Sequence, residues 1–384
     1  MLDADALTID ALRSAGSIKW SLFPEAIGAF VAEMDFGTAP AVTATLHRAV
    51  DDAAFGYLPP HLEHAMAGAA ADWQRDRYGW PIGADRIHPL PDVLKGLEVA
   101  IARYSAPGSP VILPTPAYMP FRNVIALMDR EVIEVPLALE GRRYTLDLAG
   151  IEAAFAAGAG LLVLCNPYNP VGRVFNRAEL TDPADVVTRT GGRVFSDEIH
   201  APLTFPGHEH VPYASLSVET AAHTITATSA SKAWNLAGLK CAQIILSSDA
   251  DAARWEEFGH YVSHGASTLG VIANTVAFTQ GAAWLDEVIA YLDGNRIALA
   301  DLLADRIPEI RYTPPEGTYI GWLDARELGL DVAPAEFFRE RARVALTDGA
   351  NTGEPGRGFV RFILATPRPI IEEAVDRMAG ALGR

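Results

Sequence analysis

The sequence contains only two cysteines, Cys165 and Cys241, among 384 residues. Two cysteines cannot build a disulfide framework or a cysteine-rich zinc site, so both kinds of protein are excluded. Basic residues are also few, because 31 Lys and Arg stand against 48 Asp and Glu, for a formal net charge of −17. This balance argues against binding to nucleic acid or to an anionic membrane surface. An anionic ligand would need a local pocket.

Long hydrophobic runs are missing as well. No segment approaches the roughly 18 apolar residues that a membrane helix requires. The first residues carry acids where a signal peptide has its basic region. We therefore expect a cytoplasmic protein that is not bound to a membrane. Apolar residues still make up 49% of the chain, which indicates a large folded core rather than a disordered chain.

Strand and helix patterns alternate through most of the chain. Short apolar runs bounded by Gly and Pro predict buried parallel strands at 110–113, 161–164, 194–195 and 243–246. Longer helical patterns lie at 93–104, 121–128 and 178–190. This alternation predicts a mostly parallel sheet covered on both faces, with ligands beyond the carboxyl ends of its strands.

The last third of the chain has a different pattern. It predicts one long helix at 282–304, strands at 310–312 and 318–323, a helix at 334–342 and a strand at 358–364. This order is typical of a smaller α+β unit, with the long helix joining it to the rest.

The segment from Thr226 to Lys240 places Lys232 among small and hydroxylic residues. Burial lowers the pKa of a lysine and makes its amine a candidate nucleophile for an imine. The hydroxyls of Ser229 and Ser231, with the cation of Lys240, suit phosphate oxygens. A solvated Ser/Lys turn followed by a helix is the alternative, and this segment alone does not separate the two.

Two further segments follow predicted strands. Residues 165–174 contain two Asn-Pro pairs and a glycine, which predict a rigid turn from which Asn169 can direct an amide into a cleft. An ordinary proline-rich loop is the alternative. Asp197 ends the next strand, where its carboxylate needs a cation or a proton donor. His200 follows three residues later, and such a pair by itself is more often a hydrogen-bonded core feature than a catalytic one.

Together these residues suit one cofactor, pyridoxal 5′-phosphate (PLP). PLP needs a lysine for a Schiff base, a carboxylate for its pyridinium nitrogen, and hydroxyls with a cation for its phosphate. The order Asn169, Asp197, Lys232, Lys240 resembles that of the class I and II aminotransferases, which are fold-type I PLP enzymes. The forms Met-Asp-Phe at 34–36 and Ser-Asp-Glu-Ile-His at 196–200 resemble the MalY/PatB-type carbon–sulfur (C–S) β-lyase branch, and similar motifs run nearly end to end.

This resemblance implies the α/β fold of PLP-dependent transferases related to aspartate aminotransferase. A mostly parallel seven-stranded sheet would lie in a large α/β/α domain at 49–286. A small α+β domain would combine 1–48 with 287–384. The resemblance also implies a homodimer with shared active sites.

The resemblance assigns roles by position. Lys232 would carry the cofactor, Asp197 would keep the pyridine nitrogen protonated, and Tyr118 would stack on the ring. Asn169 would hydrogen-bond the 3′-oxygen and contact substrate, and His200 stands where many aminotransferases carry a tyrosine. The groups implied for the phosphate are Ser229, Ser231, Lys240, the backbone amides of Val93 and Leu94 at a helix start, and Tyr57 from the neighbouring subunit. Arg361 would bind the substrate carboxylate through a bidentate fork.

The implied activity is a C–S β-lyase that converts a sulfur-containing L-amino acid to pyruvate, ammonia and a thiol. An aminotransferase that uses a 2-oxo acid needs the same residues and stays open as the alternative. A non-catalytic protein on this scaffold would be expected to lose Lys232 or Asp197, and both are present. The histidine pairs at 61–64 and 208–210 lack the His-Glu-x-x-His spacing of a zinc helix, so no metal site is expected.

Overall fold

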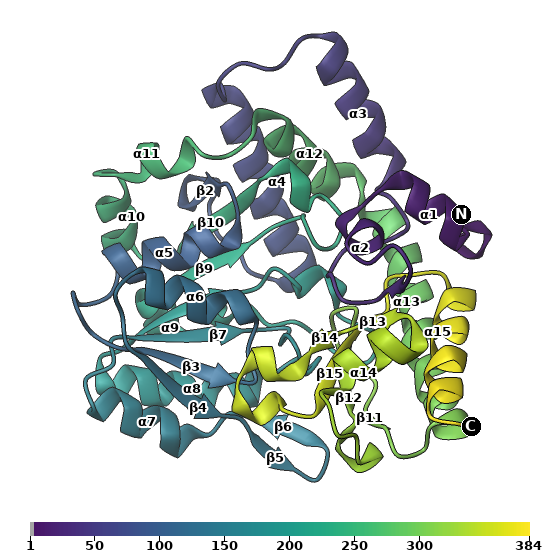
Figure 1. Cartoon of the computed structure of the whole chain (residues 1–384). Helices are drawn as coiled ribbons and strands as arrows, with labels where there is room; N and C mark the ends of the chain where they lie inside the picture. The colour runs from purple at the N-terminus through teal and green to yellow at the C-terminus, as the bar shows by residue number, and fades with distance from the viewer. Residues whose placement is uncertain (1–3) are drawn as a thin grey trace.

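Seven strands form one large sheet in the middle of the molecule (Figure 1). The computed structural model describes residues 4–384. In space the strands follow the order β2-β10-β9-β8-β7-β3-β4. Their bounds are β2 Ile87–Leu90, β3 Val111–Thr115, β4 Val132–Pro136, β7 Leu161–Cys165, β8 Arg193–Asp197, β9 Thr224–Thr228 and β10 Ala242–Leu246.

Helices cover this sheet because its strands are apolar on both faces. Every residue of β3, β7, β9 and β10 is buried, as expected for a sheet between two helical layers. Helix α5 packs against β8, β9 and β10, whereas α6 and α7 pack against β3 and β4. The helices of this part are α3 Pro40–Asp51, α4 Pro60–Tyr78, α5 Val93–Arg103, α6 Met119–Leu127, α7 Leu148–Ala156, α8 Arg177–Thr190, α9 Val218–His223, α10 Asp249–Trp255, α11 Gly259–Ser263 and α12 Thr268–Gln280.

The predicted α/β class and the mostly parallel sheet are confirmed, with one correction. Strand β10, expected as a parallel strand at 243–246, runs antiparallel to both β9 and β2. A strand buried on both faces has the same apolar run in either direction, so the pattern could not show its direction. Strands β2, β4 and β9 were not predicted. In β9 three of the five residues are threonines, so this strand has no continuous apolar run in the sequence.

A second, four-stranded antiparallel sheet lies beside the first and contains β11 (Arg311–Tyr312), β12 (Ile320–Asp324), β15 (Phe359–Ile363) and β14 (Thr347–Asp348) in that order. The long helix α13 (Ala282–Arg306) packs against α15 (Arg368–Ala381) at its side (Figure 1). The N-terminal segment joins this part, because β1 (Ile27–Gly28) pairs with β13 (Val344–Ala345). The α+β character predicted for the last third is confirmed.

The remaining elements are short. They include α1 (Ile9–Ala15), α2 (Ile18–Ser21), the hairpin of β5 (Ala138–Glu140) and β6 (Arg143–Thr145), and α14 (Pro334–Phe337), which continues into a π-helical turn at Phe338–Ala342. The expected domain limits, 48/49 and 286/287, fall inside α3 and α13 and stay a prediction. Within residues 4–384, no helix has both the length and the apolarity to cross a membrane.

Candidate active site

A cavity of about 750 Å³ opens at the carboxyl ends of β7, β8 and β9, next to the four-stranded sheet. All but two of the predicted site residues line it. They are Lys232, Asp197, Asn169, His200, Tyr118, Ser231, Lys240, Val93, Leu94 and Arg361. The three parallel strands end side by side, so their following loops converge on the same space.

Lys232 lies in the turn that follows β9, with its amine in the cavity. Its Nζ donates a hydrogen bond to the carbonyl oxygen of Ala32 at 2.9 Å. The hydroxyl of Tyr319 donates to the same oxygen, also at 2.9 Å. Burial, helped by the positive charge of Arg361, lowers the pKa of Lys232 to about 8, against the opposing effect of Glu33 and Asp197. A neutral amine is therefore accessible near neutral pH.

Asp197 is the last residue of β8 and is buried. One carboxylate oxygen, Oδ1, accepts a hydrogen bond from the amide of Ile199 at 3.0 Å. Burial raises the pKa of Asp197 to about 7, although the charge of Lys232 opposes the rise. His200 is buried nearby, and its Nδ1 has no hydrogen-bond partner within residues 4–384. Burial lowers the pKa of His200 to about 3, so its ring is neutral at neutral pH.

Arg361 comes from β15 and places a buried guanidinium in the cavity wall. Its Nη1 lies 3.4 Å from both Asn169 Oδ1 and Met119 Sδ, and its Nη2 lies 3.5 Å from the carbonyl oxygen of Phe30. Its Nε has no partner in the described chain. Burial lowers the pKa of Arg361 to about 10. A buried cation with only long, neutral contacts is suited to receive a carboxylate.

One corner of the cavity gathers groups suited to a phosphate. Helix α5 begins at Val93, and Val93 and Leu94 line the cavity together with Ser231 and Lys240. The Lys240 amine forms an ion pair with Asp92, the N-cap residue of α5, at 3.1 Å. A helix N-terminus beside a cation and a hydroxyl is a general anion-binding arrangement.

The structure does not bring Ser229 or Tyr57 to this cavity. The Ser229 hydroxyl donates to the carbonyl of Cys241 at 2.7 Å and accepts the amide of Ser231 at 2.9 Å, so it holds the turn instead of facing the cavity. Tyr57 is 86% exposed and packs against His264, with ring centroids 5.3 Å apart. The role of Tyr57 toward a neighbouring subunit stays a prediction.

Several residues at the site were not singled out from the sequence. Tyr319 does not line the cavity, but its hydroxyl donates to the Ala32 carbonyl that also accepts from Lys232. Glu336 and Arg339 line the cavity from α14 and the turn after it. No local signal distinguishes such charges from ordinary surface charges, because only the packing of α14 brings them to the cavity.

Replacing Asp197 by asparagine should change how stability depends on pH in the cofactor-free protein. Between about pH 4 and 7 the folded wild type keeps its Asp197 proton while the unfolded chain loses it, so stability falls as pH rises. Asparagine cannot titrate. The melting temperature of Asp197→Asn minus that of wild type should therefore grow from pH 4 to pH 7 and stay constant above pH 7. The corresponding change in the free energy of unfolding is on the order of a few kcal/mol. A pH-independent difference would contradict the raised pKa.

The donor set of this cavity fits PLP. It offers a buried amine of lowered pKa, a buried carboxyl at a strand end, an aromatic ring from Tyr118, and an anion corner at the start of α5. The unpaired nitrogens of His200 and Arg361 leave polar groups for a ligand to satisfy. Within residues 4–384, no group of three or more His, Cys, Asp or Glu side chains is placed to hold a metal ion.

Comparison with known proteins agrees with this geometry. Residues 30–378 match the family model described as aminotransferase class I and II. A cystathionine β-lyase of Corynebacterium glutamicum is 37% identical over 97% of this chain and 99% of its own. Cystathionine β-lyase PatB of Bacillus subtilis is 30% identical over 95% of this chain and 96% of its own.

A solved structure extends the match to the fold and the cofactor. Cystalysin from Treponema denticola, which contains PLP, superposes with a TM-score of 0.93 at 32% identity, over 100% of this chain and 99% of that one. This confirms the predicted fold family, cofactor and branch. The chain belongs to the class I and II aminotransferase family and, within it, to the PLP-dependent C–S β-lyases of the PatB and MalY type.

Proposed function

We propose that this enzyme is a cystathionine β-lyase, which converts L-cystathionine and water to pyruvate, ammonia and L-homocysteine. The observation that carries the proposal is the presence of an amine of lowered pKa and a buried guanidinium in one cavity. The amine of Lys232 has a lowered pKa, and the guanidinium of Arg361 lacks a carboxylate partner in the described chain. Such a site binds an amino acid by its α-carboxylate and presents a base to its α-proton.

Each residue of the cavity would have a separate role in this reaction. PLP, when bound, supplies the electron sink that stabilises negative charge at Cα. Arg361 binds the α-carboxylate through its fork and so orients the Cα–H bond. The Nζ of Lys232 accepts the proton from Cα, for which a pKa near 8 is well matched at neutral pH. Asp197 would hold the pyridine nitrogen, and Asn169 would hold the 3′-oxygen beside the same guanidinium.

Charges at the mouth of the cavity favour a long substrate. Cystathionine ends in a second amino and carboxyl group, beyond its sulfur. Glu336 has no hydrogen-bond or ion-pair partner among residues 4–384. Arg339, three residues later, is 43% exposed, pairs with the exposed Glu340 at 3.7 Å and lies over the ring of Phe23, 5.5 Å from its centroid. The two side chains offer one charge of each sign for the distal end of the substrate.

Replacing Arg339 by alanine should raise the KM for L-cystathionine by up to about fivefold, since exposed ion pairs contribute about 0.2–1 kcal/mol. The KM for S-methyl-L-cysteine, which has no distal charges, should stay unchanged. Steady-state kinetics with both substrates measures the difference. Arg341→Ala on the same turn is the control, because Arg341 does not line the cavity. Equal changes for the two substrates would show that Arg339 does not contact the distal group.

The reaction class is tested by supplying L-cystathionine without any 2-oxo acid and measuring pyruvate, ammonia and thiol together. Sustained release of the three products in equal amounts supports the lyase. The family model also covers aminotransferases, so the alternative is transamination. Turnover that appears only after a 2-oxo acid is added would favour that alternative.

We also propose that the enzyme acts as a homodimer in the cytoplasm. Support for the dimer comes from exposed aromatic side chains around Tyr57. Phe55 is 66% exposed and Tyr261 is 83% exposed. Large apolar side chains exposed in one region of a surface are typical of a protein–protein interface. Sedimentation of the purified protein gives its mass, and a monomer at micromolar concentration would contradict the dimer.

A further inference from the structure

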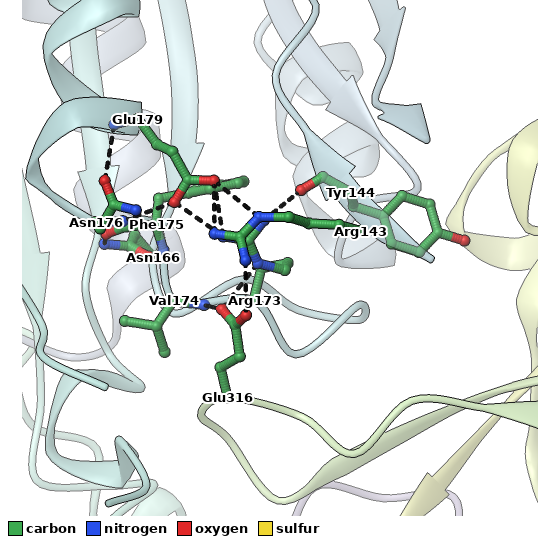
Figure 2. Close-up of polar contacts among 9 residues, drawn as sticks. All are labelled: Arg143, Tyr144, Asn166, Arg173, Val174, Phe175, Asn176, Glu179 and Glu316. Atoms are coloured by element: carbon green, nitrogen blue, oxygen red, sulfur yellow. Dashed lines mark hydrogen bonds and ion pairs between the residues drawn. The ribbon is translucent and has the colours of Figure 1, made fainter. Parts of the chain in front are cut away.

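Four side chains form an ion-pair cluster outside the cavity (Figure 2). The Arg173 cluster consists of Arg143, Arg173, Glu179 and Glu316. Arg173 is only 5% exposed. Its Nε donates to Glu316 at 2.8 Å, and its Nη2 donates to both oxygens of Glu179 at 2.8 and 2.9 Å. Its Nη1 donates to the carbonyl of Tyr144 at 2.6 Å. Every nitrogen of this buried guanidinium therefore has an acceptor.

The cluster joins four parts of the fold. Arg173 lies in the Asn-Pro loop, residues 166–175, between β7 and α8. Glu179 lies in the first turn of α8, and Arg143 lies in the β5–β6 hairpin, where it pairs with Glu179 at 3.0 Å. Glu316 comes from the segment that precedes β12 of the four-stranded sheet. The contact between Arg173 and Glu316 thus connects the loop after β7 of the large sheet to the segment before β12 of the four-stranded sheet.

Backbone contacts hold the same two segments together. The carbonyl of Gly172 accepts the amides of Glu316 at 2.7 Å and Gly317 at 3.1 Å. The amide of Val174 donates to the carboxylate of Glu316 at 2.9 Å. Gly172 has a φ of +74°, and a Cβ there would lie 2.3 Å from Cβ of Pro315. The segments are in direct contact, and Glu316 is the residue that binds both backbone and guanidinium.

The Asn-Pro loop carries Asn169 into the cavity. The amide of Tyr168 donates to the carbonyl of Arg173 at 2.7 Å, and the amide of Gly172 donates to the carbonyl of Tyr168 at 2.8 Å. These bonds close a turn with Asn169 inside it. The amide oxygen of Asn169 lies 3.4 Å from Arg361. A shift of Arg173 would therefore move Asn169 relative to the carboxylate-binding arginine.

The second segment reaches the lysine. Tyr319 follows Glu316 by three residues, and its hydroxyl donates to the Ala32 carbonyl that also accepts from Lys232. The two segments joined by the Arg173–Glu316 contact thus lead to Asn169, which lines the cavity, and to Tyr319, which shares a hydrogen-bond acceptor with Lys232.

We infer that Arg173 is a positioning residue, which fixes Asn169 and Tyr319 relative to each other by binding Glu316. The inference rests on the proposed function only where turnover is measured. It predicts that breaking the contact with Glu316 disturbs the cavity more than breaking the contact with Glu179. The latter contact stays within the large sheet and its helices.

The first test replaces Arg173 by methionine and reads the cofactor-free protein by hydrogen exchange. Exchange should rise in peptides covering 166–176 and 313–319, since these hold the amides of Val174, Glu316 and Gly317 that join the two segments, and stay unchanged in α12 and α15. The loaded variant should lose about 100-fold in kcat/KM, the loss that a misplacement of about 1 Å can produce. The affinity for PLP should fall as well. Arg189→Met, in the exposed pair Arg189–Glu152, should change none of these values.

The second test separates positioning from stability. Glu316→Ala should reproduce the kinetic loss and the local exchange, whereas Glu179→Ala should lower the melting temperature with a smaller loss of kcat/KM. Arg173→Lys should rescue part of the activity, because lysine keeps the charge but not the fork. The inference is overturned if Arg173→Met folds and exchanges like wild type, or if exchange rises equally over the whole chain. The exchange and PLP-binding readouts need no substrate, so they hold even if L-cystathionine is not turned over.

Discussion

Replacing Lys232 by alanine should abolish both the visible absorbance of the lysine-linked cofactor and the release of pyruvate. Among residues 4–384, Lys232 and Lys240 are the lysines that line the cavity, and Lys240, at the corner suited to a phosphate, is mostly exposed. Loss of a general base alone lowers kcat by about 10²–10⁴-fold. Loss of the covalent attachment adds to this. The measurement is a spectrum of the purified variant with added PLP, followed by a pyruvate assay.

Two controls make this prediction specific. Lys95→Ala removes a half-exposed amine that pairs with Glu98 on α5, and it should keep spectrum and turnover. Methylamine added to Lys232→Ala should restore part of the activity, because the truncated side chain leaves room for a small base in the cavity. A Lys232→Ala variant that keeps wild-type absorbance and turnover would show that another amine does the work.

The sequence predicted which residues meet in the cavity better than it predicted the sheet. Asn169 and Lys232 follow strands and Asp197 ends one, and parallel neighbours bring such positions together. Strand direction is different. β10 has an apolar run like that of β7, yet it is antiparallel, because the chain returns from β9 through residues 229–241 without a crossover helix. No pattern within five residues records that.

Contacts between residues that are far apart in the sequence explain which features of the site could not be predicted. Ser229 and Ser231 look equivalent in the sequence, but the Ser229 hydroxyl is taken by the carbonyl of Cys241, and only Ser231 lines the cavity. Arg173 and Glu316 are 143 residues apart, so neither residue type nor spacing indicates their pairing. The position of a side chain can be predicted from the sequence when its place in a strand or turn fixes it. When a partner far away in the sequence fixes it, the structure is needed.

Replacing Arg361 by methionine should lower activity and raise stability at the same time. Truncating one member of a buried charge pair costs about 2–5 kcal/mol of binding, which converts to a loss of about 30- to 5,000-fold in kcat/KM. Without substrate, however, the guanidinium is buried with only long, neutral contacts, and its pKa is lowered by burial. Replacing buried charge by an apolar side chain of similar size is often stabilising, by about 1–4 kcal/mol.

The two effects are measured on the same preparations. Thermal melting of the cofactor-free variant should show a higher melting temperature than wild type, and steady-state kinetics of the loaded variant should show the loss mainly in KM for the amino-acid substrate. Arg361→Lys is the matched control, because it keeps the buried charge and should gain no stability while still losing the fork. Methionine at this position leaves the β15 backbone pairing with β12 intact, since that pairing uses main-chain groups. A variant that melts below wild type would mean that the guanidinium stabilises the empty cavity, and substrate would then bind an arginine that already has its partners.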